Sequence, residues 1–351
     1  QEVTLRQLMC HRSGLVRESP IGGYLDPNEP SVDASIQSLA GCALVNPPSS
    51  KTRYSNIGVT VVGQAVAAAS QQAFADYQQE HLLGPLGMTH SAWRMNDRLR
   101  DKLAAGYMRV ADNEGGFYHT QAPTFELGTI PAGNLYSSAR DMVKFASMIL
   151  DNGTLGDHVF LQPQTLQSMF KPQLVEDESG FGLGFYVASF AGHKAVRHSG
   201  AVYGFSCSIV VLPDPGVAVI VLANEDIVSG RVQRIAEAGL SLLLEAKTGQ
   251  ELPTQPAPMT LTEQQLSQFA GHYESASYWA EISLNEGLLS ADVSGQPLQL
   301  TAIKDDHFEA DGRFAYEATM KFTRGEGGEV TGFNVLGQEF RRVDASTAAE
   351  S

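Results

Sequence analysis

The chain has 351 residues, of which 43% are hydrophobic and only 18% are charged, so it has enough apolar content for a sizeable core and is not a disordered or coiled-coil protein. Its 39 acidic and 24 basic side chains give a net charge of -15, which disfavours binding to nucleic acid or an anionic membrane. No apolar run reaches the roughly 20 residues of a membrane-spanning helix. We therefore expect a globular protein of two domains.

Cysteine and histidine usage gives no sign of a metal site or a cofactor. The three cysteines lack metal-type spacing, and the nine histidines form no H-x-x-x-H cluster. A Cys10–Cys42 disulfide stays open, although buried free thiols are favoured. Because the chain begins at Gln1 rather than Met, we expect that any leader has been removed or never belonged to this sequence. The compartment is open, with a periplasmic or secreted location slightly favoured.

The first part of the chain reads as helices separated by surface loops. VTLRQLMCHRSGL, residues 3–15, predicts a short helix that runs into a loop, and a second helix is expected over residues 33–39. The run IGVTVVGQAVAAAS, residues 57–70, is so uniformly apolar and small that it predicts a helix buried on nearly every side. A further helix follows and stops at Gly84-Pro85.

The middle of the chain alternates loop and helix. Residues 89–129 predict a loop-rich segment without a motif. In the stretch that follows, Ser138 can cap a helix that ends at Asn152-Gly153. Another helix begins at Pro163 and stops before Pro172.

The chain is organised around residues 194–226. Two β-branched runs, residues 208–212 and 217–222, flank the turn P-D-P-G and predict a long, mostly buried antiparallel hairpin. A strand precedes it in FGLGFYVASF. A long helix is expected over residues 229–246, with Val232, Ile235, Ala236, Leu240 and Leu243 on its apolar face.

The C-terminal part predicts a separate unit. Residues 247–261 contain three prolines and few apolar side chains, as a linker would. After a short helix capped by Thr262, alternating runs separated by turns predict a small antiparallel barrel or sandwich. The expected domains are residues 1–246 and 262–345.

Two short motifs carry candidate chemistry. Tyr54-Ser55-Asn56 stands at the entry of the apolar helix, where a hydrogen-bonded helix-entry pair is the structural alternative. His198-Ser199-Gly200 stands on a strand edge just before the hairpin, where a small residue and a glycine let a ligand lie against the backbone. A plain strand entry is the alternative there.

Together, Y-x-N and H-x-G resemble the penicillin-recognising serine hydrolases. VTLRQLMCHRSGL, P-L-G-M and AGNLYSSARDMVKF are similar to the branch with class C β-lactamases, bacterial esterases and D-amino-acid-specific peptidases. The likeness covers roughly residues 2–246, and the C-terminal module resembles the small barrel appended to some members. It implies an α/β (α+β) fold, an antiparallel sheet flanked by helices as in β-lactamases and transpeptidases, plus a C-terminal antiparallel β-barrel.

The resemblance also implies a mechanism, acyl transfer to water through an acyl-enzyme. Tyr54 would relay the proton between serine and leaving group, with its pKa lowered by adjacent cations. Asn56 would hold a lysine or the substrate carbonyl. His198, which stands where relatives often have lysine, would keep Tyr54 oriented and the site electropositive. Gly200 would let the substrate approach, and the N–H of Ala201 would donate to the oxyanion.

The family's S-x-x-K motif precedes the HxSGL-like stretch, so we expect the nucleophilic serine and its lysine N-terminal to Gln1. The one formal match, at Ser168 and Lys171, lies after Tyr54, and its lysine is better interpreted as a cation on a helix C-terminus. Histidine in place of lysine disfavours β-lactams and favours small esters or D-amino-acyl peptides and amides. A non-catalytic ligand-binding pseudoenzyme is the alternative function, and a homo-oligomer stays open.

Overall fold

The computed structural model describes residues 2–24, 26–111, 117–173, 179–249, 258–275, 278–312, 318–335 and 338–344. The helices are α1 Leu5–Met9, α2 Val32–Gln37, η1 Ser38–Gly41, α3 Asn56–Ser70, α4 Phe74–Gln78, η2 Gln79–Leu83, α5 Asp97–Arg100, α6 Ile130–Gly133, α7 Ala139–Leu150, α8 Pro163–Met169, α9 Ser229–Thr248, α10 Glu263–Leu266 and η3 Ser267–Phe269. The strands of the N-terminal part are β1 Tyr107–Ala111, β2 Phe117–Gln121, β3 Thr154–Leu155, β4 His158–Val159, β5 Gly180–Phe181, β6 Tyr186–Phe190, β7 His193–Val202, β8 Phe205–Leu212 and β9 Val217–Ala223.

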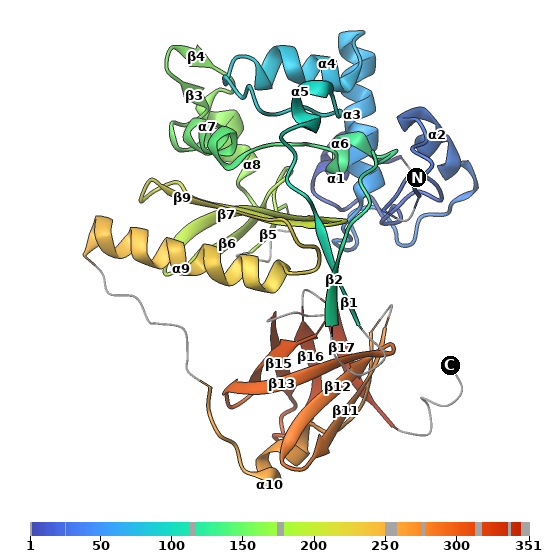
Figure 1. The fold of residues 1–351 in the computed structure, drawn as a ribbon, viewed down its shortest axis with the longest axis vertical. Coiled ribbons are helices and arrows are strands. Elements are labelled where there is room, and N and C mark those ends of the chain that lie inside the picture. Colours follow the sequence, from blue (N-terminus) through green and yellow to red (C-terminus); the bar gives the residue numbers. More distant parts are fainter. Residues whose placement is uncertain are drawn as a thin grey trace.

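A five-stranded antiparallel sheet in the order β5-β6-β7-β8-β9 forms the centre of the N-terminal part. Helix α9 covers one face of it, and α7 packs on the other (Figure 1). Because side chains alternate along a strand, Val210 and Leu212 of β8 pack with α9 while Val211 packs in the cluster around α7. The predicted antiparallel sheet flanked by helices is confirmed.

A second group of helices surrounds α3, which contacts α1, α2, α4 and α6. The prediction that α3 is buried on nearly every side is wrong, because only its first half is covered: the buried positions end at Gly63, and Ala68 and Ala69 are exposed. Gly63 lies against Pro131 of α6, and this close approach needs a residue without a side chain. The small apolar residues of the last turns tolerate water at little cost.

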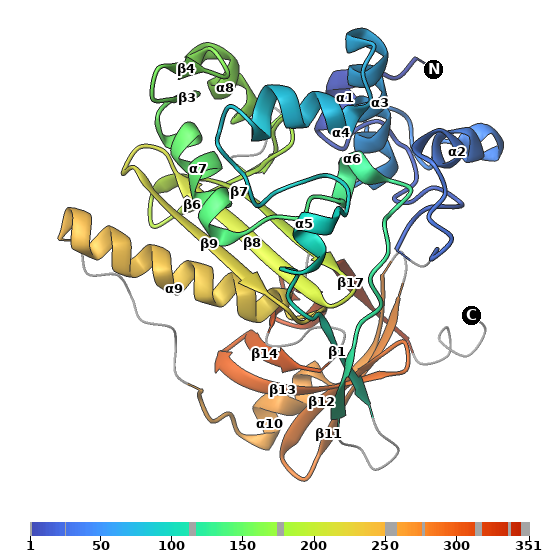
Figure 2. The ribbon, with the colours of Figure 1, turned by 45° about the horizontal axis from the view of Figure 1, so that its top comes forward.

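The segment 89–129 is more ordered than the predicted loop. It contains α5 and the antiparallel hairpin β1–β2, whose first residue pairs in parallel with Glu225 beyond the end of β9. The hairpin extends toward the C-terminal barrel (Figure 2), and Arg109 on β1 lies 3.6 Å from the carboxylate of Asp311. Contacts between distant segments stabilise this hairpin, and a pattern of local sequence does not reveal them.

Helix α9 confirms the long helix predicted after the central hairpin, but two members of the predicted apolar face are wrong. Its buried side chains are Val232, Ala236, Leu240 and Leu244, together with Gly230. Ile235 and Leu243 are 52% and 41% exposed. The buried positions recur every four residues. Ile235 and Leu243 each precede one of them by one residue, so their side chains lie beside the contact with the sheet and not within it.

The C-terminal part is the predicted antiparallel barrel, and the structure shows that it is closed and has eight strands. The strands are β10 Gly271–Glu274, β11 Trp279–Asn285, β12 Leu288–Val293, β13 Gln296–Lys304, β14 His307–Asp311, β15 Ala318–Arg324, β16 Val330–Val335 and β17 Gln338–Val343. Aromatic side chains that include Tyr273, Phe308 and Phe333 fill its interior. Thr262 caps α10 as expected. Of the predicted linker, residues 250–257 lie outside the described residues, and the domain boundaries stay a prediction.

Two further findings concern the described part of the chain. None of its helices combines the length and the apolar character needed to cross a membrane. Cys10, Cys42 and Cys207 are free thiols, and of the three only Cys10 is fully buried.

Candidate active site

The two motifs lie on neighbouring elements that face each other. Tyr54 directly precedes α3, whose N-cap Ser55 accepts a hydrogen bond from the N–H of Gly58. His198 and Gly200 lie on β7, on the sheet face that carries Val196 and Val211 and is turned toward α7. The ring centroids of Tyr54 and His198 are 6.2 Å apart. The fold thus brings together residues 144 positions apart in the sequence.

The end of β7 that carries the H-x-G motif has an open edge. Pairing between β6 and β7 stops at Tyr186 and Arg197, whereas pairing between β7 and β8 continues to Val202. Among the described strands, residues 198–202 therefore have a neighbour on one side only. Alternate N–H and C=O groups of this stretch point away from β8, as an extended substrate would require.

The side chain of Asn56 is buried and binds a carboxylate. Its Nδ2 donates to Oε1 of Glu18 at 2.5 Å, and it also hydrogen-bonds Tyr24. Sequence reasoning expected a lysine or a substrate carbonyl as its partner, and neither role is tested by this contact. Burial raises the pKa of Glu18, and the hydrogen bond from Asn56 opposes that shift.

Residues 16–18 are fixed against the start of α3. Ser55 Oγ donates to the carbonyl of Val16 at 2.7 Å, and the N–H of Asn56 donates to the carbonyl of Arg17 at 2.8 Å. These bonds satisfy groups at a helix N-terminus that have no partner within the helix. They also place Arg17 and Glu18 beside Tyr54.

The expected charge distribution of the site needs two corrections. Burial, with Tyr24 and Glu18 adding to it, raises the pKa of Tyr54 to about 12, although Arg17 opposes the shift. The predicted lowering of this pKa is therefore wrong. Burial also lowers the pKa of His198, so at neutral pH this ring does not make the site electropositive. The cation beside Tyr54 is Arg17, whose guanidinium carbon lies 4.9 Å from the centroid of the tyrosine ring.

The hydrogen bonding of His198 fixes its tautomer. Its Nδ1 lies 2.8 Å from the carbonyl oxygen of Ser199, and because a carbonyl only accepts, Nδ1 carries the proton. In the neutral ring the lone pair is then on Nε2. His198 can accept a proton or a hydrogen bond at that atom.

Gly200 and Ala201 follow on the same strand. A methyl group at position 200 would lie 2.8 Å from Sγ of Cys207 on β8, so the glycine leaves room for a neighbouring side chain as well as for a ligand. Ala201 is exposed and lies opposite Ser206. Ser168, the formal S-x-x-K serine, lies on α8, where its Oγ donates to the carbonyl of Thr165 at 2.7 Å.

Sequence reasoning missed the residues that enclose Tyr54. They are His11, Arg17, Glu18, Tyr24 and Phe181. His11 lies in the HRSGL stretch, which resembles a family motif but does not indicate a contact with Tyr54. The adjacent charged residues Arg17 and Glu18 in a loop are the one local sign that this segment lies near a site. Nothing local links Tyr24 or Phe181 to position 54.

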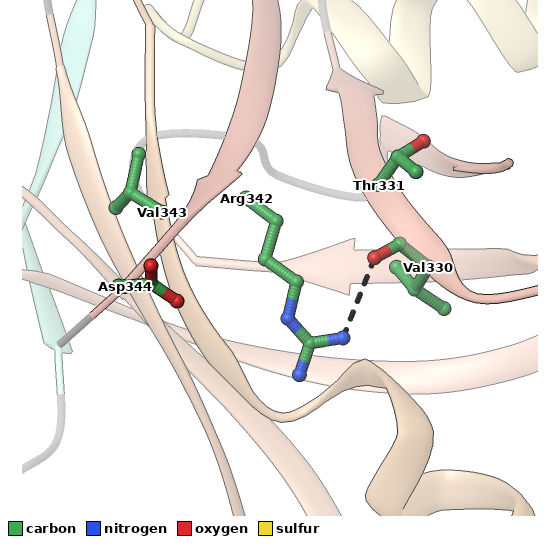
Figure 3. Close-up of a pocket in the computed structure, with 5 residues that line it drawn as sticks. All are labelled: Val330, Thr331, Arg342, Val343 and Asp344. Atoms are coloured by element: carbon green, nitrogen blue, oxygen red, sulfur yellow. Dashed lines mark hydrogen bonds between the residues drawn. The ribbon is translucent and has the colours of Figure 1, made fainter.

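A separate hollow of about 410 Å³ on the barrel does not belong to this site. It is lined by Val330, Thr331, Arg342, Val343 and Asp344 (Figure 3). The guanidinium of Arg342 donates to the carbonyl oxygens of Val330, Gln268 and Ala270, so it holds the barrel end together. None of the residues predicted from the two motifs lines this hollow.

Comparisons with known proteins agree with the fold. Residues 1–242 match the model of the family described as Beta-lactamase. The chain is 35% identical over 164 residues to Beta-lactamase-like protein 2 of Dictyostelium discoideum, a match over 44% of this chain and 29% of that protein. The chain spans less than two thirds of the length of the curated relatives with which it was compared.

Solved structures show the same fold. The octameric penicillin-binding protein homologue from Pyrococcus abyssi superposes with a TM-score of 0.58 at 22% identity, over 96% of this chain and 78% of that one. The D-amino acid amidase from Ochrobactrum anthropi SV3 superposes with a TM-score of 0.52 at 22% identity, over 64% of this chain and 65% of that one. The fold is that of the β-lactamase and penicillin-binding class. The chain belongs to the β-lactamase family.

Proposed function

We propose that the protein is a serine hydrolase that works through an acyl-enzyme and cleaves small D-amino-acyl amides, peptides or esters. The observation that carries this proposal is the pairing of Tyr54 with His198 across the junction of α3 and β7, beside the open edge of β7. A phenol and an imidazole within reach of one strand edge are suited to moving a proton on and off a substrate that lies along that edge.

The proposed roles follow from the charge states. With a pKa near 12, Tyr54 is a neutral phenol at physiological pH and can give its proton to the leaving group. Nε2 of His198 can accept the hydrogen bond that keeps the phenol oriented. The N–H of Ala201 is proposed to donate to the oxyanion, and Gly200 to leave room for the substrate. Asn56 is proposed to contact the substrate carbonyl or the lysine.

The nucleophile is the remaining component. In the family it belongs to an S-x-x-K motif, and the one match within residues 1–351 is the serine of α8 whose hydroxyl binds its own helix. We therefore propose that the serine and lysine lie before Gln1. The lysine would take the proton of the serine hydroxyl, and Tyr54 would relay a proton to the leaving group.

Glu18 supports a substrate that carries an amine. Its carboxylate lies next to Asn56, and its side chain keeps 26% exposure, so a ligand can reach it. An α-ammonium group would pair with it. The D-amino acid amidase that shares this fold is named for substrates of this class.

A fluorophosphonate probe tests the proposal on the native protein. We expect one adduct, mapped by peptide mass spectrometry to a serine outside residues 1–351, and turnover of a p-nitrophenyl ester that falls at least about a hundredfold in Tyr54→Phe. An adduct on Ser168 would overturn the motif order. The Ser168→Ala variant is the matched control and should keep both labelling and turnover.

A non-catalytic binding protein of the same fold is the second candidate. The observation that favours it is that burial leaves Tyr54 and His198 both neutral at physiological pH, so neither of them is a strong base by itself. It predicts a folded protein that binds a D-amino acid amide, measured by calorimetry, without turnover or a fluorophosphonate adduct.

Two further proposals concern the organisation of the protein. Limited proteolysis tests the proposed domain boundaries at residues 246 and 262. Light scattering tests a homo-oligomer, which the octameric homologue from Pyrococcus abyssi suggests.

A further inference from the structure

His11 and Tyr54 are joined by more contacts than a packing neighbour needs. Their rings are stacked, with centroids 4.1 Å apart and an angle of 30° between the planes. The carbonyl of His11 accepts the N–H of Arg53 at 2.7 Å, and Nδ1 of His11 accepts the N–H of Ser55 at 3.2 Å. The residues before and after Tyr54 are thus both hydrogen-bonded to His11, and the side chain between them lies on its ring.

The surroundings of His11 hold it in this position. The residue is 1% exposed, and Phe181 meets its ring edge-on with centroids 4.5 Å apart. Its φ of 57° is in the left-handed region, which residues other than glycine seldom adopt and which tends to occur at functional sites. This backbone turn is what allows both the carbonyl and the ring of one residue to face the segment 53–55.

The ring of His11 is neutral. Burial, together with the neighbouring His198 and Arg17, lowers its pKa to about 4. Nδ1 accepts a backbone N–H, so the single ring proton is on Nε2. Across the physiological range His11 therefore neither takes a proton from a reacting group nor adds charge to the site, and it acts through Tyr54 alone.

From these contacts we propose that His11 is a positioning residue for the proposed reaction: its ring and its two backbone-directed hydrogen bonds hold the Tyr54 phenol at the distance from His198 that proton relay requires. This inference rests on the proposed function. The stack limits the rotation of the tyrosine side chain, and the bond to Ser55 fixes the start of α3, which also carries Asn56. Losing the stack displaces the phenol while the rest of the fold stays in place.

Two substitutions separate the parts of this arrangement. In His11→Asn the amide oxygen can take the position of Nδ1, and asparagine tolerates a left-handed backbone, so the hydrogen bond remains and the stack is lost. In His11→Phe the stack remains, the N–H of Ser55 loses its acceptor, and the left-handed backbone becomes more strained. His158→Asn is the control. His158 also packs on an aromatic ring, that of Phe160, but it lies on β4, outside the proposed site.

The expected result on the native protein is a split between kcat and KM for a p-nitrophenyl ester. In His11→Asn, kcat falls on the order of a hundredfold with KM and melting temperature close to the wild type, because a misplaced catalytic group costs about that much in rate. In His11→Phe, the melting temperature falls and kcat is retained better than in His11→Asn. His158→Asn matches the wild type in all three quantities.

A measurement without turnover separates a failure of this inference from a failure of the proposed function. In protein with labelled tyrosine, the NMR signal of the Tyr54 ring should shift in His11→Asn, because the ring current of the stacked imidazole is lost, and should stay in His158→Asn. An unchanged Tyr54 signal in His11→Asn overturns the inference whatever the activity. A wild type that neither turns over esters nor takes the fluorophosphonate overturns the proposed function, while the NMR result still decides the role of His11.

Discussion

At the scale of single residues, the proposal assigns substrate selection to the charge of Glu18. We expect Glu18→Gln to raise KM for D-phenylalanine amide about fivefold, because a partly exposed ion pair of this kind contributes on the order of 1 kcal/mol. KM for an uncharged acetyl ester should stay within about twofold. Glutamine keeps the hydrogen bond that Asn56 donates, so a change confined to the amide isolates the charge. Equal changes in KM for both substrates would show that Glu18 maintains the conformation of the loop and does not bind the ammonium group.

The depressed pKa of His11 makes the stability of the fold depend on pH. The folded pKa is about 4 against an ordinary 6.5, so the unfolded chain binds a proton that the folded protein excludes. Stability is full above pH 6.5 and falls as the pH drops toward 4, by roughly 3 kcal/mol in total. Urea unfolding at several pH values should show this slope in the wild type and a smaller one in His11→Asn. His198 contributes in the same direction in both proteins, so identical slopes would contradict the assignment to His11.

At the scale of helices and strands, the contact between α3 and α6 depends on Gly63. A methyl group there would lie 2.3 Å from Cβ of Pro131, in a ring that cannot rotate away. Alanine improves helix propensity by about 1 kcal/mol, but overpacking of this kind costs roughly 1 to 3 kcal/mol. Because the clash is severe, we expect the cost to lie at the upper end, so that Gly63→Ala lowers the free energy of unfolding by up to about 2 kcal/mol. Gly41→Ala, with open space around the new methyl group, is the control and should be neutral; a neutral Gly63→Ala would show that α6 can shift.

The elements differ in how much of them the sequence predicts. Caps such as Ser138 and Thr262, the β8–β9 hairpin and the C-terminal antiparallel barrel follow from local patterns and were predicted, whereas the closure of that barrel by eight strands was not. The β1–β2 hairpin was missed because its partners lie about a hundred residues away. In the site, Tyr54 and His198 could be paired through the family's motif order. The raised pKa of Tyr54 and the lowered pKa of His198 both run against the charges that the motifs imply. Both shifts come from burial, which a short motif does not reveal.

At the scale of the whole molecule, charged contacts converge on one barrel strand. Glu309 and Asp311, both on β14, pair with Arg234 of α9 and Arg109 of β1. All four side chains are partly exposed, and pairs of this kind contribute at most about 1 kcal/mol each. The same helix α9 also covers the sheet that carries His198, so its contact attaches the barrel to the outer layer of the N-terminal part.

Because the attachment is weak and electrostatic, reversing its charges should loosen the barrel without unfolding it. We expect Glu309→Lys with Asp311→Lys to increase the radius of gyration in small-angle scattering, since each lysine would face an arginine, while the melting temperature stays within a few degrees. High salt should move the wild type in the same direction. Adding Arg109→Glu and Arg234→Glu restores opposite charges at both pairs and should return the scattering curve to that of the wild type. A charge-reversed protein with an unchanged curve would mean that apolar packing between α9 and β15 holds the barrel, and ester turnover in that variant would then report only on the catalytic part.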